Sequence, residues 1–61
     1  MTIKEQIFAI RETGITNMFD VKMVQYLANE LEFFELVLFL EEHSKEYVQF
    51  IISGEDGFLN V

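Results

Sequence analysis

The sequence predicts an all-α domain of three helices, in which the third helix is either continuous or broken near Ser44. Apolar residues recur at helical spacing along most of the 61-residue chain, and helix-ending signals separate those stretches. Hydrophobic residues make up 51% of the chain, which excludes disorder for most of it. The predicted domain spans residues 1–54. Residues 55–61 are expected to form a flexible acidic tail, from which Phe58 and Leu59 could dock on the core.

The first helix is predicted from Ile3 to Thr13. Thr2 is followed three residues later by Glu5, a capping-box pattern in which each residue satisfies a backbone N–H of the other. Gly14 stands where helices commonly end in a left-handed residue. The apolar residues that repeat at helical spacing in this segment are Ile3, Ile7 and Ile10.

The second helix is predicted to follow Asp20 and to end near Leu31. The Asp20 carboxylate can accept the free N–H groups of the first turn and interacts favourably with the helix dipole. Phe19 and Val24 occupy the positions of a hydrophobic staple. An exposed apolar finger formed by Met18 and Phe19 is the less favoured interpretation.

The stretch after residue 33 is ambiguous between helix and strand. Residues 35–40 and 47–52 could each form a short buried strand, which would give an α+β fold with a C-terminal hairpin. Residues 41–46 contain no Gly, Pro, Asn or Asp for a turn, and their Glu and Lys residues favour helix. Helix is therefore the preferred prediction, with Ser44 able to cap a new start and Gly54 ending the segment.

The charge is confined to one half of the chain. Residues 1–29 hold three acids and three bases, whereas residues 30–61 hold eight acids and only Lys45, so the second half carries the whole net charge of −7. This acidity argues against binding to nucleic acids or anionic membranes, which both require clusters of Lys and Arg. The sequence shows neither a membrane span nor a secretory signal, so a cytoplasmic location is expected.

A chain of this size buries only about 60% of the surface that it exposes when unfolded. The sequence has no Cys and a single His, so neither a disulfide nor a structural zinc ion is expected. Self-association is the remaining way to cover the excess apolar surface, which predicts a homodimer. The predicted interface comprises Phe33, Phe34, Leu38, Phe39 and Tyr47.

No set of residues specifies a reaction. His43 with Glu42 and Glu46 forms at most a small cluster on one helical turn, and we interpret it as a solvated polar turn rather than a metal or proton-transfer site. Ser44 adjoins His43 in sequence, but adjacent helical residues do not face each other. The protein is therefore expected to have no catalytic activity, metal or cofactor.

The acids of the third helix are the candidate partner-binding residues. Glu35, Glu42 and Glu46 fall near one another on one helix face with Glu41 at its edge, so this helix could present a negative stripe opposite its buried side. They could simply keep an apolar protein in solution, or they could imitate phosphates and recognise a basic surface, such as that of a nucleic-acid-binding protein. The candidates are Glu35, Glu41, Glu42 and Glu46.

Short segments in a fixed order resemble a known family. They are residues 3–7, 9–11, 16–20 and 34–37, followed by Glu41-Glu42 and residues 45–51. Over about residues 2–54 the chain resembles a family of very small phage and prophage proteins of Gram-positive bacteria, catalogued as a domain of unknown function. A Gly near position 33 is replaced here by Phe33, which implies that the second and third helices are joined more continuously than in relatives.

The resemblance implies a setting but no active-site residues. A small acidic phage protein is expected to bind and inhibit a host protein in the host cytoplasm, for example a nucleic-acid-binding enzyme or a defence complex, in the manner of an anti-CRISPR. The alternative is a non-catalytic structural or regulatory adaptor that acts through an apolar dimer surface.

Overall fold

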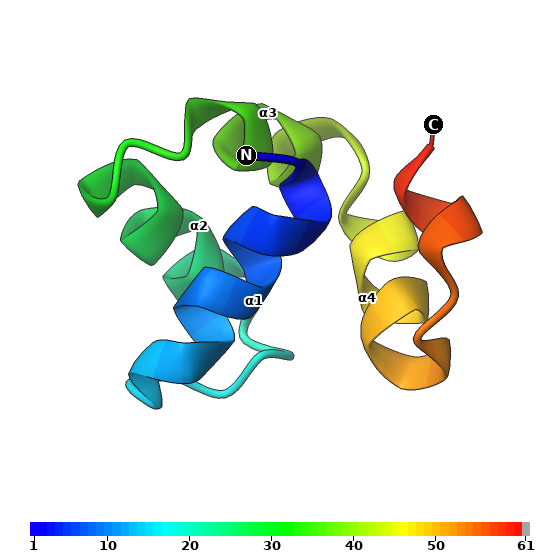
Figure 1. Cartoon of the computed structure of the whole chain (residues 1–61), viewed down its shortest axis with the longest axis horizontal. Helices are drawn as coiled ribbons and strands as arrows, with labels where there is room; N and C mark the ends of the chain where they lie inside the picture. Colours follow the sequence, from blue (N-terminus) through cyan, green and yellow to red (C-terminus); the bar gives the residue numbers. More distant parts are fainter. Residues whose placement is uncertain (61) are drawn as a thin grey trace.

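Four α-helices and one 3₁₀ turn form the fold in the computed structural model, which describes residues 1–60 (Figure 1). α1 lies in the middle of the molecule, with α2 on one side, α4 and η1 on the other, and α3 across one end (Figure 1). The all-α prediction is confirmed, and the hairpin alternative is wrong, because no strand occurs within residues 1–60. The elements are α1 (Ile3–Thr13), α2 (Val21–Glu30), α3 (Phe34–Glu42), α4 (Ser44–Ser53) and η1 (Asp56–Leu59).

The predicted capping residues begin and end α1. The Thr2 N–H donates to Glu5 Oε1 at 2.8 Å, and the Glu5 N–H donates to Thr2 Oγ1 at 3.1 Å. Hydrogen bonds from the Thr2 backbone and side chain lower the pKa of Glu5 from 4.5. Gly14 closes the helix with a φ of 65°, in the left-handed region where glycine has no Cβ penalty. Local contacts thus define both ends of this helix.

α2 begins as predicted, because Asp20 Oδ1 accepts the Met23 N–H at 3.2 Å. The sequence implied a more continuous junction between α2 and α3, and the C-terminal end of α2 differs from this expectation. Glu32 adopts a φ of 61°, and the Phe33 N–H donates to the Ala28 carbonyl at 2.8 Å, which is the bond of a Schellman motif. The two helices are therefore separate, and Glu32 occupies a left-handed position that usually belongs to glycine.

The third predicted helix is broken in two, close to the predicted position. His43 has φ −134° and ψ 42°, and it separates α3 from α4, which starts at Ser44. Ser44 does not serve as the cap, because His43 occupies the cap position and no side chain bonds the first turn there. The His43 ring lies 5.6 Å from the Phe39 ring and packs at the bend.

α3 receives its N-terminal cap from a distant helix. Phe33, at its cap position, offers no side-chain acceptor, and the buried N–H of Leu36 donates instead to Gln6 Oε1 at 3.2 Å. The Gln6 amide also donates to the Met1 carbonyl at 3.1 Å, so this buried polar side chain is satisfied at both ends. α1 and α3 are thereby held by hydrogen bonds as well as by packing.

One chain forms a complete core. Its radius of gyration is 10.1 Å, close to the value of about 10.5 Å expected for a globular chain of this length. Tyr47 is fully buried, its hydroxyl donates to the Met18 carbonyl at 2.6 Å, and burial raises its pKa to about 12. The buried apolar residues are Ile7, Ile10, Val24, Ala28, Leu36, Phe39, Leu40, Tyr47 and Phe50.

The segment after α4 folds back along the molecule. Asp56 Oδ2 lies 3.0 Å from Lys4 Nζ, and Phe58 and Leu59 pack against the core. Residues 55–61 were predicted as a flexible tail with Phe58 and Leu59 able to dock, and the structure has the docked arrangement. Val61, the last residue of that predicted tail, lies outside the described residues.

Candidate partner-binding surface

The outer face of α3 carries two large apolar side chains. Leu36, Phe39 and Leu40 turn into the core, so the helical repeat places Phe34 and Leu38 on the opposite side. Phe34 is 55% exposed and Leu38 is 63% exposed, and the two are neighbours at i and i+4. Glu35 and Glu42 lie next to them, seven residues apart and thus on one side of the helix. Phe34, Glu35, Leu38 and Glu42 are together termed the α3 ridge.

The ridge lies in a segment without positive charge. Residues 30–42 contain five glutamates and no Lys or Arg. Within residues 1–60 the only ion pairs are Lys4–Asp56 and His43–Glu46, so no basic side chain neutralises these glutamates. The ridge thus combines exposed apolar area with uncompensated negative charge.

The four predicted partner-binding carboxylates do not form one stripe. Glu35 and Glu42 share a side of α3, but Glu41 turns towards α2, where it accepts a hydrogen bond of 3.0 Å from the Gln25 amide. Glu46 belongs to α4, beyond the break, and its Oε1 lies 3.2 Å from His43 Nδ1. The prediction of one acidic stripe is wrong, because the break at His43 interrupts the helical register on which the stripe depended.

The predicted dimer-interface residues divide between surface and core. Phe34 and Leu38 are exposed and available, and Phe33 is half-buried against the core. Phe39 and Tyr47 are core residues of a single chain, so the prediction that they form the dimer interface is wrong. Their apolar character suited either location, so the sequence alone could not separate them.

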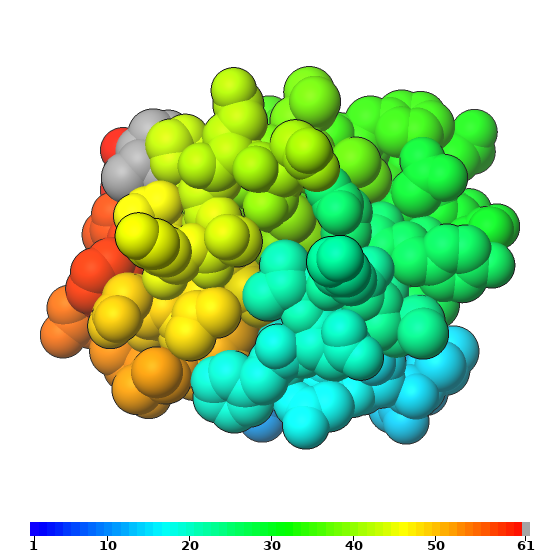
Figure 2. Space-filling view, turned by 180° about the vertical axis from the view of Figure 1, so that it is seen from behind, coloured from blue at the N-terminus to red at the C-terminus, as the bar shows by residue number. Residues whose placement is uncertain are grey.

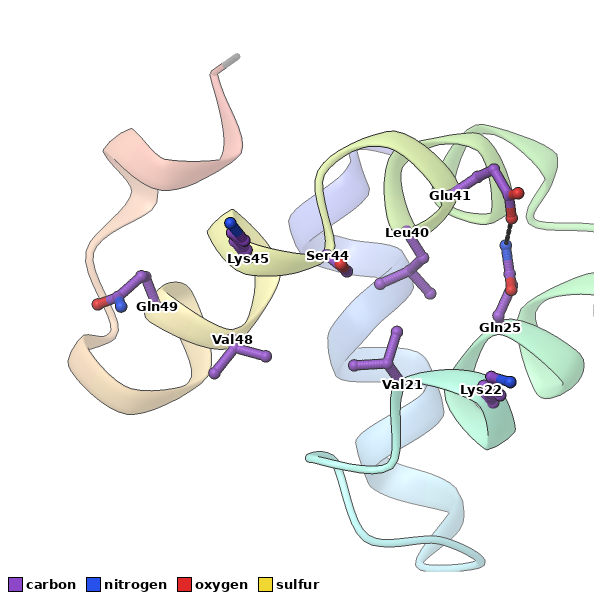
Figure 3. A pocket seen from close by; sticks show the side chains of 9 residues that line it. All are labelled: Val21, Lys22, Gln25, Leu40, Glu41, Ser44, Lys45, Val48 and Gln49. Carbon is purple, nitrogen blue, oxygen red and sulfur yellow. Dashed lines mark hydrogen bonds between the residues drawn. The ribbon is translucent and has the colours of Figure 1, made fainter.

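A groove that the sequence did not reveal opens beside α3. α2, the end of α3 and α4 meet on the face seen in Figure 2, and their side chains line an open groove of about 580 Å³. Val21, Leu40 and Val48 supply its apolar floor, while Lys22 and Lys45 lie on opposite sides of it (Figure 3). The lining residues, termed the lysine groove, are Val21, Lys22, Gln25, Leu40, Glu41, Ser44, Lys45, Val48 and Gln49.

The rim of the lysine groove is held by Gln25. Its side-chain amide donates at 3.0 Å to Glu41 and at 3.0 Å to the Val37 carbonyl, and thereby ties α2 to α3 (Figure 3). Lys22 and Lys45 form no ion pair with any residue in the described part of the chain. No short sequence motif could have brought these two lysines together, because they lie on different helices.

His43 does not lie in a cluster of potential metal ligands. Among residues 1–60, no group of three His, Cys, Asp or Glu side chains is placed to hold a metal ion. The contact between His43 and Glu46 spans i to i+3 within one turn, and the Phe39 ring lies beside it. These two contacts pack His43 into the bend between α3 and α4. Within the same residues, no helix has the length and apolar character needed to cross a membrane.

Comparison with known proteins places the chain in a family. Residues 1–55 match the sequence model of a family described as Domain of unknown function (DUF5049). The chain belongs to this family. The match includes all four helices of this DUF5049 protein and ends before η1. No curated protein and no solved structure shows significant similarity to the chain.

Proposed function

We propose that this DUF5049 protein is a non-catalytic binding protein whose α3 ridge docks on a basic surface of another protein and blocks that surface. The observation that carries the proposal is the exposure of Phe34 and Leu38 within a segment that has five glutamates and no base. Protein interfaces commonly combine a desolvated apolar centre with a polar rim. The ridge has this composition, with Glu35 and Glu42 along one side of its two apolar side chains.

Charge favours a partner of opposite sign. An acidic surface accelerates encounter with a basic one and repels other acidic proteins. The carboxylates of the ridge would occupy positions where a nucleic-acid-binding partner holds phosphates. Blocking such a surface would inhibit a host enzyme or a defence complex in the host cytoplasm, and the resemblance to small phage proteins supports this setting.

The test is capture of partners from a host lysate on the immobilised protein. The ridge variants are Leu38→Ser and the double charge reversal Glu35→Lys/Glu42→Lys. Matched controls are Ile52→Ser, which alters an equally exposed apolar residue on α4, and Glu30→Lys/Glu55→Lys, which makes the same charge change off the ridge. We expect the ridge variants to lose a partner that the controls retain.

Two further conditions sharpen the test. Higher ionic strength should weaken capture, since exposed charges are screened by salt, and added nucleic acid should compete if the partner uses its nucleic-acid site. A partner that is captured equally by the ridge variants would disprove the proposal.

A second candidate is an adaptor that binds through apolar contact alone. The exposure of Phe34 and Leu38 favours it independently of charge. In that case Leu38→Ser abolishes capture, whereas Glu35→Lys/Glu42→Lys leaves capture and its salt dependence unchanged.

A further inference from the structure

The basic residues of the chain are distributed unevenly with respect to its grooves. The chain has only four Lys and Arg residues against eleven acids, and Lys4 is engaged by Asp56. Of the others, Lys22 and Lys45 both border the lysine groove and form no ion pair within residues 1–60. In a protein with a net charge of −7, this groove has two positive side chains against one carboxylate, that of Glu41.

The α3 ridge has the complementary properties. Two apolar side chains project from it beside two carboxylates, while the groove has an apolar floor between two ammonium groups. The two surfaces also adjoin each other, because Leu38 of the ridge stands one helical turn from Glu41 on the groove rim. A surface with both features side by side can pair with a second copy of itself.

We propose that two copies of this chain form a symmetric dimer in which the α3 ridge of each copy seats in the lysine groove of the other. Phe34 and Leu38 cover the partner's apolar floor, and Glu35 and Glu42 approach the two lysines that border it. The two-fold axis makes the same contact twice, so each single interaction is doubled.

Charge excludes the simpler alternative of ridge against ridge. That arrangement would place the glutamates of both copies together with no base between them, and like charges brought together in an interface are costly. Seating the ridge in the groove converts the same carboxylates into ion pairs. It also covers the apolar residues that one small chain leaves exposed.

The inference concerns the same ridge as the proposed function, and it deepens that proposal by adding a means of regulation. The dimer hides the ridge, so an outside partner must compete with the second copy. Self-association needs no outside partner, and the purified protein alone can test it.

The experiment measures mass by sedimentation equilibrium or light scattering over a range of protein concentrations. Lys22→Glu should weaken dimerisation by about tenfold or more, since it replaces an attraction with a repulsion. Arg11→Glu is the matched control, because it makes the same charge change at an exposed residue outside the groove. Circular dichroism verifies that each variant stays folded.

The decisive experiment exchanges the charges of the ridge and the groove. Lys22→Glu/Lys45→Glu and Glu35→Lys/Glu42→Lys should each be monomeric alone. An equimolar mixture should recover a heterodimer, because both of its ridge–groove contacts again pair opposite charges. A monomeric unmodified protein, a dimer insensitive to Lys22→Glu, or a mixture that remains monomeric would each overturn the inference. A monomer that still captures a host partner through the ridge would leave the proposed function intact.

Discussion

Both faces of α3 carry large apolar side chains, but only one of the two faces packs into the core. The inner face places Leu36, Phe39 and Leu40 in the core, while the outer face holds Phe34 and Leu38 in contact with solvent. A surface helix normally turns its apolar residues towards the core and its polar residues towards solvent. Here Phe34 and Leu38 stay exposed to solvent, and for this reason we propose the outer face as the binding surface.

The strongest test of this comparison exchanges one leucine on each face for alanine. Leu36 is fully buried, so Leu36→Ala should cost about 2–5 kcal/mol of unfolding free energy through lost contacts and a cavity. Leu38→Ala should change the stability of the monomer by no more than about 0.5 kcal/mol. Urea denaturation at a concentration where the chain is monomeric measures both. Similar losses at the two positions would break the distinction between the faces.

The second test concerns the hydrogen bond that anchors the inner face to α1. Gln6→Ala leaves the buried N–H of Leu36 without an acceptor, which should cost about 1–3 kcal/mol. Gln49→Ala serves as the control, because Gln49 is exposed and its side chain forms no hydrogen bond with residues 1–60. Thermal unfolding compares the two, and equal midpoints would show that the long-range cap contributes nothing.

The third test stabilises the entry to α3 without altering either face. Glu32 holds a left-handed conformation, which costs a residue with a Cβ roughly 1 kcal/mol. Glu32→Gly should recover about 1 kcal/mol, whereas Glu32→Ala keeps the penalty and should gain nothing by this route. If both variants have the same unfolding midpoint, the left-handed position does not limit stability.

The smallest effect is expected at the start of α1, far from the contrast between the two faces. The pKa of Glu5 is lowered in the folded state, so its contribution to stability is fully present above pH 4.5 and is lost as the pH falls through the folded-state pKa. The midpoint difference between the unmodified protein and Glu5→Gln should therefore diminish at acidic pH. A difference that is constant from neutral to acidic pH would contradict this assignment.

Short-range signals made much of the fold predictable. Thr2 with Glu5, Asp20 and Gly14 act on backbone groups within three or four residues, so their geometry follows from local sequence. The Glu and Lys residues between positions 41 and 46 likewise decided helix over hairpin correctly. Phe34 and Leu38, two of the residues predicted for a dimer interface, are exposed, and their part in such an interface stays a prediction.

The candidate site was less predictable because its parts come from separate helices. The predicted acidic stripe assumed one continuous helix, and the bend at His43 moved Glu46 onto another element. The lysine groove depends on how α2 and α4 lie beside the end of α3, and Lys22 and Lys45 have no sequence relation that indicates it.

The sequence by itself determined the helical class, the starts of α1 and α2, and the segregation of charge into the second half of the chain, because these depend on composition and near neighbours. Only the tertiary structure decided that Leu36 enters the core while Leu38 does not, that Gln6 caps a helix 30 residues away, and that two lysines border one groove. The physical reason is that α3 carries large apolar side chains on both sides. Packing against α1 and α2 selects which side is buried and leaves the other exposed.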